Sequence, residues 1–229
     1  MNAESGGPAA LHPIEPFPVV LAGPSGSGKT TIARALLERR PDLSFSVSVT
    51  SRPPREGERD GVDYRFMPRS DFERLIAEGG LLEWAEVHGE LYGTARSSLD
   101  DAVRAGVHLL LDIDVQGARS VRRLVPGAVT IFLLPPTGRD IIARLKGRGT
   151  EDSAALRRRL RTAEKELAGV GEFDYAVVND DLDACVAAVE GIIASERLRI
   201  DHRRAATEKE AAGMLEEIRR VLSEEGSKA

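Results

Sequence analysis

The residues best suited to chemistry lie between Gly23 and Thr30, where the chain reads Gly-Pro-Ser-Gly-Ser-Gly-Lys-Thr. This spacing is that of a phosphate-binding loop, which requires a strand before it and a helix after it. The glycines let the backbone turn tightly, so that successive N–H groups and the positive end of the helix point at one anion. Lys29 can reach the β- and γ-phosphates, and the Thr30 hydroxyl can bind Mg²⁺. The loop predicts a nucleoside triphosphate ligand; the alternative, a turn without a ligand, is disfavoured by the flanking strand and helix.

The elements that would position this loop lie on both sides of it. The apolar run from Phe17 to Ala22 predicts a strand, and residues 29–39 predict a helix that is stopped by Pro41. Strand and helix signals then alternate along the chain, which is typical of an α/β protein with helices on the faces of a parallel sheet. The further strands are expected at residues 43–49, 107–111, 128–134 and 175–178.

Helix starts are marked by capping boxes, in which two side chains bond the first free amides of a helix. The candidate pairs are Ser70 with Glu73, Thr137 with Asp140, and Thr207 with Glu210. The helices that begin at Ser70 and at Thr137 should end at glycines, at positions 79–80 and 147 respectively. A helix over 154–167 carries an apolar stripe, and Asp180 can cap a later helix that runs through the 190s.

The C-terminal helix, expected over residues 207–222, has one apolar face. Its members are Met214, Leu215, Ile218, Val221 and Leu222. An apolar face of this kind has to be covered. We expect it to pack on the protein's own domain, with a contact in a dimer as the alternative.

A second segment, residues 50–66, lacks helical periodicity and is rich in Arg, Pro, Gly and Asp. Arg52 and Arg55 lie three residues apart and are held by prolines. Arginine presents a rigid fork of donors that matches phosphate oxygens, and Tyr64 could add a hydroxyl donor. The segment therefore suits a second phosphate group; the alternative is a solvated loop with scattered charges.

Composition excludes several classes of protein. In 229 residues, 41% are hydrophobic and 30% charged, which suits a water-soluble domain with a real core. No apolar run approaches the roughly 20 residues that span a membrane, and residues 1–15 predict a disordered tail rather than a signal peptide. The net charge of −5 argues against nucleic acid as a partner. A single cysteine, Cys185, allows no internal disulfide, fits a cytoplasmic location and is expected to be a buried hydrophobe.

Taken together, these segments resemble the guanylate kinases of the bacterial type, which are P-loop nucleoside monophosphate kinases. The pattern T-S-R-x-x-R-x-x-E-x-x-G-x-D-Y-x-F at residues 50–66 is similar to that family's substrate signature along its whole length. Further segments that look like the family lie at 82–85, 92–94, 111–117, 144–150 and 178–183. The resemblance covers roughly residues 16–198 and leaves out the two tails.

The resemblance implies a three-layer α/β fold of the P-loop NTPase type, with a parallel sheet core, an inserted mixed α/β GMP-binding region and a helical lid. The domain would span residues 16–202, with its core at 16–49, 98–143 and 169–202. The GMP-binding region would be 50–97 and the lid about 144–168. Residues 203–229 would form a C-terminal helical extension.

The implied reaction transfers the γ-phosphoryl of ATP to GMP or dGMP, giving ADP and GDP, with Mg²⁺ as cofactor. The implied catalytic residues are Lys29, Arg52, Arg148 and Arg159. The ATP-binding residues would be Gly23, Pro24, Ser25, Gly26, Ser27, Gly28, Lys29, Thr30, Thr31, Arg144, Arg148 and Asn179. The GMP-binding residues would be Ser48, Arg52, Arg55, Tyr64, Glu83, Tyr92, Thr94, Asp112 and Asp114. Thr30 would bind Mg²⁺ together with ATP phosphates and water.

Within this set, the resemblance assigns guanine recognition to Ser48, Glu83, Thr94 and Asp114. Many family members carry Ser where this chain has Thr94, which keeps the hydroxyl. The assignment agrees with the chemistry, because the edge of guanine presents N–H donors and carboxylates are acceptors. Asp112 ends an apolar strand, and two roles stay open for it: an outer-shell partner of Mg²⁺, or support for Lys29 and Asp114.

The lid implied by the resemblance supplies cations to the phosphoryl group in transfer. Arg144, Arg148 and Arg159 would meet ATP, whereas Arg157, Arg158 and Arg161 are interpreted as a solvated face. Helical phase supports the division, because Arg159 flanks the apolar stripe and Arg158 points away from it. No histidine is expected to act in catalysis or to bind a metal.

Two alternatives from other classes remain. A guanylate-kinase-like interaction module would share the fold but lose residues of the phosphate loop or the lid, which this chain retains. A kinase for another nucleoside monophosphate would differ at the base, where Glu83 and Asp114 favour guanine. The sequence leaves open whether the protein is a monomer or a homodimer.

Overall fold

The structure, a computed structural model, describes residues 15–87, 89–146 and 153–226. Its centre is a parallel sheet of five strands in the order β2-β7-β1-β8-β9. These are β2 (Leu43–Phe45), β7 (His108–Asp112), β1 (Pro18–Ala22), β8 (Val129–Leu134) and β9 (Tyr175–Val178). The α/β class and the parallel sheet expected from the sequence are confirmed.

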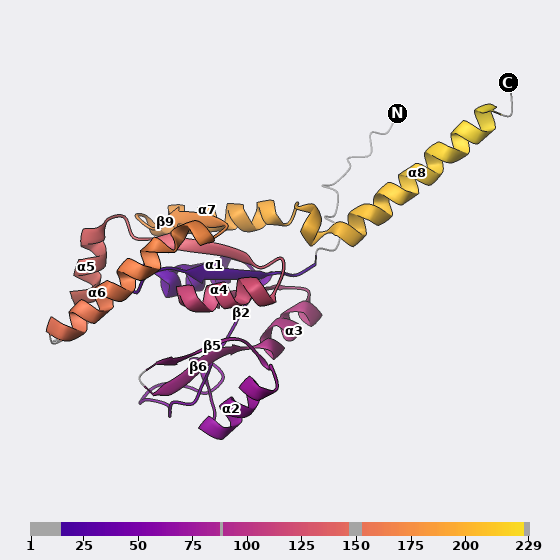
Figure 1. Cartoon of the computed structure of the whole chain (residues 1–229). Helices are drawn as coiled ribbons and strands as arrows, with labels where there is room; N and C mark the ends of the chain where they lie inside the picture. Colours follow the sequence, from indigo (N-terminus) through magenta and orange to yellow (C-terminus); the bar gives the residue numbers. More distant parts are fainter. Residues whose placement is uncertain (1–14, 88, 147–152, 227–229) are drawn as a thin grey trace.

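Helices cover both faces of this sheet, because alternate residues of β1 point to opposite sides. Val19 and Leu21 pack against α1 (Lys29–Arg39) and α7 (Leu182–Glu196). Val20 and Ala22 pack on the other face, against α3 (Arg96–Ala105) and α4 (Val115–Leu124). The three layers are visible in Figure 1, where α7 and α4 lie on either side of the sheet.

A second sheet forms a smaller lobe beside this core (Figure 1). Its four strands run in the order β4-β3-β6-β5. They are β3 (Val49–Thr50), β4 (Arg65–Phe66), β5 (Leu81–Val87) and β6 (Glu90–Ala95), and β5 pairs antiparallel with β6. Helix α2 (Arg69–Ala77) covers one side with Phe72 fully buried. Contacts between α4 and β5 join the lobe to the core.

A pair of helices follows β8. Helix α5 (Gly138–Lys146) packs on α6 (Ser153–Ala168) through Ile141 and Leu145, and the single turn η1 (Val170–Glu172) leads on to β9. The facing residues on α6 are Leu156, Leu160, Ala163 and Leu167. The apolar stripe expected over 154–167 is therefore confirmed. The helix end expected at Gly147 lies outside the described residues.

The strand expected over residues 43–49 is wrong as one element. The chain leaves the core sheet after Phe45 and enters the small sheet at Val49, so two short strands replace one. The Ser46 amide still donates to the Leu110 carbonyl at 2.9 Å, next to the core ladder. An alternating run predicts extended backbone but does not say with which sheet each part pairs.

The capping boxes are correct in one case out of three. The Thr137 hydroxyl accepts from the Asp140 amide at 3.2 Å, as expected. Ser70 lies inside α2, which begins one residue earlier after Pro68, and α8 (Arg204–Gly226) begins three residues before Thr207. The cap of α7 is Asp181, which accepts from Ala184 at 2.8 Å, rather than Asp180. Proline is favoured at a helix start, and the exact first residue of a helix varies by one or two positions, so a side-chain pattern alone does not fix it.

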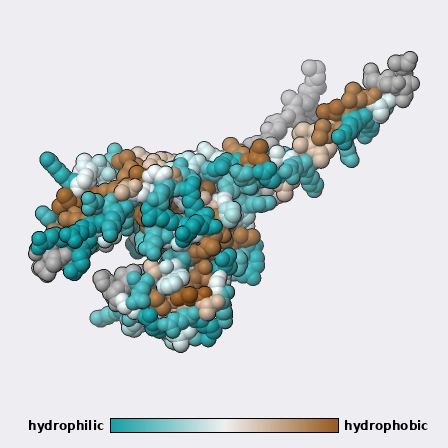
Figure 2. Space-filling model, viewed as in Figure 1, coloured by the Kyte–Doolittle hydropathy of each residue, from teal (hydrophilic) through white to brown (hydrophobic). Residues whose placement is uncertain are grey.

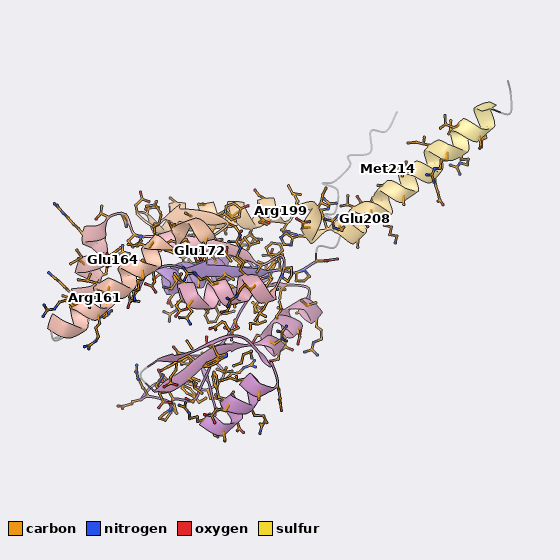
Figure 3. The ribbon with its side chains drawn as sticks, in the orientation of Figure 1. Arg161, Glu164, Glu172, Arg199, Glu208 and Met214 are labelled. Atoms are coloured by element: carbon orange, nitrogen blue, oxygen red, sulfur yellow. The ribbon has the colours of Figure 1, made fainter. Side chains whose placement is uncertain are left out.

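Helix α8 contradicts the expectation that its apolar face packs on its own domain. After the short turn η2 (Ile200–His202) the helix projects from the body of the protein (Figure 1). Met214 is 63% exposed and Leu222 is 65% exposed, and brown apolar surface marks the helix in Figure 2. Met214 is labelled along this helix in Figure 3. Within the described residues, the apolar face of α8 is therefore not covered by the rest of the domain.

Two further expectations concern composition. Cys185 is buried in the core, as expected. Across the ranges that the structure describes, no helix combines the length and apolar character needed to cross a bilayer.

The difference between core and projecting helices predicts a difference in stability. Ile193 on α7 is fully buried, whereas Ile218 on α8 is 56% exposed. We expect Ile193→Ala to lower the free energy of unfolding by about 2–5 kcal/mol, because it leaves a cavity. The matched control Ile218→Ala should change it by about 0.5 kcal/mol or less. Urea denaturation of both variants measures this, and equal losses would contradict the exposed position of α8.

Candidate active site

The loop between β1 and α1 adopts the tight geometry that its glycines permit. Gly23 and Gly28 have φ values of 141° and 95°, which side chains rarely adopt. A Cβ at Gly23 would lie 2.4 Å from the Leu133 carbonyl oxygen, and one at Gly28 would lie 2.2 Å from the Asn179 amide nitrogen. The backbone of β8 therefore excludes a larger residue at Gly23. At Gly28 a side chain would be strained by the positive φ and would displace the Asn179 amide.

The carbonyl groups of this loop accept hydrogen bonds from one donor of the loop itself and from two donors far away in the chain. Lys29 Nζ donates to the Gly23 carbonyl at 2.9 Å. Arg144 Nη1 donates to the Gly26 carbonyl at 2.7 Å, and Asn179 Nδ2 donates to the Ser27 carbonyl at 2.8 Å. Three residues expected at an ATP site, from α1, α5 and the end of β9, are thus brought to one loop.

The start of α1 meets the end of β7. Thr30 Oγ1 donates to Asp112 Oδ2 at 2.7 Å, and Thr31 follows on the exposed surface of the helix. A hydroxyl and a carboxylate beside a phosphate loop are oxygen ligands of the kind that Mg²⁺ prefers. The donor set therefore fits a magnesium ion that is shared with a bound triphosphate.

A second group of side chains suited to phosphate lies on the small sheet. Arg52 Nε donates to the Tyr92 hydroxyl at 3.1 Å. The Arg52 guanidinium lies 5.5 Å from the centre of the Tyr64 ring, which is 5.9 Å from that of Tyr92. Arg55 is exposed nearby on the same segment. The structure thus brings the largely buried guanidinium of Arg52 together with the phenol groups of Tyr64 and Tyr92.

A pair of carboxylates meets where the small sheet touches the core. Thr94 Oγ1 donates to Glu83 Oε1 at 2.7 Å, and Asp114 Oδ1 accepts from the Gly117 amide at 2.7 Å to cap α4. A Cβ at Gly117 would lie 3.0 Å from Glu83 Oε2 and 3.3 Å from Asp114 Oδ1. The absence of a side chain at Gly117 lets the two carboxylates approach each other.

This environment changes the protonation of Glu83. Burial raises the pKa of Glu83 to about 7, and the nearby Asp114 carboxylate acts in the same direction, whereas the Thr94 hydroxyl opposes the shift. A carboxyl group with such a pKa is ready to gain stability from N–H donors that a ligand brings.

A cavity of about 380 Å³ lies between α1 and the turn at residues 58–64. Its polar lining includes Thr30, Arg34, Ser48, Glu58, Tyr64 and Asp112. The cavity therefore runs from Thr30 at the end of the phosphate loop to Tyr64, one of the second group of side chains suited to phosphate. Arg34 and Glu58 were not assigned to the site from the sequence; Glu58 stands within the substrate signature, whereas no signal singles out Arg34.

The arginines expected in the lid differ in their contacts. Arg144 contacts the phosphate loop, and Arg159 Nη1 donates to the Leu145 carbonyl at 3.4 Å between α6 and α5. Arg148 lies outside the described residues. Arg157, Arg158 and Arg161 are exposed, and Figure 3 places Arg161 on α6.

Glu166, which also lies on α6, was not assigned to the site from the sequence. Burial raises the pKa of Glu166, whereas the positive charge of Lys29 opposes the shift. This carboxyl group therefore lies within electrostatic range of the phosphate loop. Its position on the flank of an apolar stripe gave no signal of this proximity.

A phosphate loop contacted by an arginine of a helical pair, and a cavity that leads from this loop to a second group of side chains suited to phosphate, are the features of a P-loop phosphotransferase with two nucleotide sites. Comparison with known proteins gives the family. The guanylate kinase family model matches residues 15–196, and the chain belongs to that family, whose reaction is the ATP-dependent phosphorylation of GMP.

Individual relatives agree with this assignment. The chain is 45% identical over 215 residues to a guanylate kinase of Chelativorans sp., covering 93% of this chain and 98% of that protein. It is 48% identical over 190 residues to one of Mycobacterium bovis, covering 82% and 89%. Among solved structures, the guanylate kinase of Anaplasma phagocytophilum matches with a TM-score of 0.67 and 34% identity, covering 84% of this chain and 91% of that one.

The raised pKa of Glu83 predicts how stability depends on pH. Between the usual value near 4.5 and the folded value of about 7, the unfolded chain loses this proton while the folded protein keeps it. Stability should therefore fall as pH rises through this range, by roughly 3 kcal/mol at most. Urea denaturation at pH 5 and pH 8 should show this loss in the wild type and a smaller one in Glu83→Gln. Equal pH dependence in both proteins would contradict the assignment to Glu83.

Proposed function

We propose that this chain transfers the γ-phosphoryl of ATP to GMP through the residues gathered around the cavity. The observation that carries the residue assignment is the meeting of Glu83 and Asp114 at Gly117. Glu83 pairs with Thr94, which lies two residues along β6 from Tyr92, the partner of Arg52. This arrangement supports a site that holds a purine at one end and a phosphate at the other. The acceptor would lie in this site and ATP on the phosphate loop.

The two carboxylates would select guanine by hydrogen bonding. Guanine presents N1–H and N2–H₂ donors, which a carboxylate accepts, whereas adenine has an unprotonated N1 at the same edge. A buried carboxylate facing adenine would lose its partner. Sites built on such bonds reject the wrong ligand by about 10⁴- to 10⁵-fold. Thr94 would orient Glu83, and Ser48 would complete the base pocket.

The phosphoryl group in transfer carries negative charge that the protein has to stabilise. Lys29 and the phosphate-loop amides would hold the ATP phosphates, and Arg144, Arg148 and Arg159 would add positive charge from the lid. Mg²⁺, bound through Thr30 with Asp112 behind it, would neutralise charge on the phosphates. The GMP phosphate, whose oxygen attacks the γ-phosphorus of ATP, would be held in position by Arg52, Arg55, Tyr64 and Tyr92.

No general base is needed, because the attacking oxygen belongs to a phosphate that is ionised at neutral pH. The histidines that the structure describes agree with this mechanism. His108 begins the strand that ends at Asp112, and its Nδ1 accepts from the Phe17 amide at 3.2 Å. His202 stacks near the same Phe17 ring, with a 4.3 Å separation of ring centres. Both lie at the end of the sheet opposite the phosphate loop.

Two rivals are less well supported. An interaction module without activity would not need Lys29, Thr30 and the lid arginines, and a kinase for another nucleotide would not need two carboxylates at the base. Phosphorylation of dGMP, a cytoplasmic location and a monomeric or homodimeric state stay predictions from the sequence.

The acceptor assay tests the proposal directly. ADP release from ATP and Mg²⁺ should be rapid with GMP and near background with AMP, with dTMP or without an acceptor. The reason is that only guanine satisfies both carboxylates. A variant with Glu83→Gln should lose activity with GMP. Turnover with AMP at a comparable rate would overturn the assignment of Glu83 and Asp114 to the base.

The role of Lys29 predicts a loss of activity without a loss of fold. Lys29→Ala should lower kcat by about 100-fold or more, because it removes positive charge that faces the transferred group. The melting temperature should change by a few degrees at most, since Lys29 bonds carbonyl groups of the loop and is not part of the hydrophobic core. Steady-state kinetics and thermal unfolding measure both. An unfolded variant would show that the lysine serves mainly the fold.

A further inference from the structure

Glu58 belongs to the signature at residues 50–66 but has no role in the assignments above. Its carboxylate accepts from Arg52 Nη2 at 2.8 and 2.9 Å, through both oxygens. It also accepts from the Arg55 backbone amide at 2.7 Å. The Glu58 amide donates back to the Arg55 carbonyl at 3.1 Å, so the chain closes into a turn. One carboxylate thus contacts both arginine positions of the second phosphate group.

The contacts of Arg52 fix its guanidinium on several sides. Nε donates to the Tyr92 hydroxyl, and Nη1 donates to the Pro53 carbonyl at 2.7 Å. The rings of Tyr64 and Phe66 lie 5.5 and 5.7 Å from its central carbon. Of these partners, Glu58 is the charged one. It therefore supplies the countercharge that holds a planar fork in a single orientation.

The ion pair is shielded from water, which makes it effective as a positioning device. The side chains of Arg52 and Glu58 are 11% and 21% exposed. The Arg55 amide, together with Arg52, keeps the pKa of Glu58 below its ordinary value against the opposing effect of burial. Glu58 is therefore ionised at neutral pH. Exposed ion pairs gain little, because the solvent screens them and both side chains stay mobile.

We propose that Glu58 is a positioning residue for the acceptor nucleotide. It holds the Arg52 guanidinium and the Arg55 backbone in the arrangement that receives the GMP phosphate. This inference rests on the proposed function, because it takes that phosphate as the ligand of Arg52. Glu58 acts through Arg52 and does not touch the phosphate, since two anions repel each other. Its removal should therefore weaken GMP binding and leave ATP binding unchanged.

The test compares Glu58→Ala and Glu58→Gln with Glu56→Gln, a matched control. Glu56 is exposed and lies two residues away on the same turn. We expect Glu58→Ala to raise the KM for GMP by about 10- to 100-fold, because a charged hydrogen-bonding partner is lost. The KM for ATP should change by less than about twofold, and kcat by less than about threefold. Glu58→Gln should give a smaller rise, and Glu56→Gln should resemble the wild type.

A second comparison separates positioning from a general structural role. In an Arg52→Ala background, adding Glu58→Ala should raise the KM for GMP by less than about threefold further, since the group that Glu58 holds is gone. Calorimetric titration with GMP in the absence of ATP, with thermal unfolding as a fold control, provides the same reading without turnover. If Glu58→Ala does not fold, Glu58→Gln carries the comparison.

The outcomes that overturn the inference are distinct from failure of the proposed function. Tighter GMP binding in the Glu58 variants would make Glu58 a competitor of the phosphate. Equal rises in both KM values, a rise like that of Glu56→Gln, or a full effect in the Arg52→Ala background would each exclude positioning through Arg52. A wild-type protein that does not phosphorylate GMP would instead overturn the proposed function itself.

Discussion

A loop that presents its backbone N–H groups to an anion has to turn its carbonyl groups elsewhere, and those carbonyls need donors. In this protein one donor belongs to the loop itself, and the other two lie more than 100 residues away along the chain. Lys29 reaches Gly23, Arg144 reaches Gly26 and Asn179 reaches Ser27. The core sheet makes this possible, because β1, β8 and β9 are neighbours and end at the same edge. The phosphate loop is therefore shaped by the whole sheet and by the helix that follows β8, not by its glycines alone.

The acceptor side is built on a different principle. Here side chains from the mixed sheet and a short turn come together with a carboxylate from the core. Glu83 comes from β5 and Asp114 from the start of α4, and they approach each other because position 117 has no side chain. Arg52 is held by a carboxylate from its own turn. In the free protein the raised pKa of Glu83 relieves the repulsion between the two carboxyl groups by protonation. In the proposed complex, N–H donors of the ligand would take over this role, which would link binding to selection.

The sequence predicted those features that depend on local pattern. The phosphate loop, helix 29–39 and the stripe over 154–167 follow from spacing alone and occur as expected. The sequence did not indicate where the alternating run at 43–49 divides between two sheets, because pairing partners lie far away in the chain. Within the candidate site, the residues that belong to the phosphate loop or to the signature at residues 50–66 could be named from the sequence. Arg34 and Glu166 could not, since only the packing of α1 and α6 brings Arg34 to the cavity and Glu166 near Lys29 of the phosphate loop.

The order of strands in the core has a consequence for the newly made chain. Phe17 and His108 touch although 91 residues separate them, and β1 pairs with β7 and β8, both encoded later. The ribosome adds about 5–20 residues per second, so β1 waits roughly 5–20 seconds for its first partner strand. The smaller sheet is complete at Ala95, before β7 is made. During synthesis, the smaller lobe can therefore form first. The fully apolar strand β1, which leads into the phosphate loop, meanwhile stays unpaired and prone to aggregation.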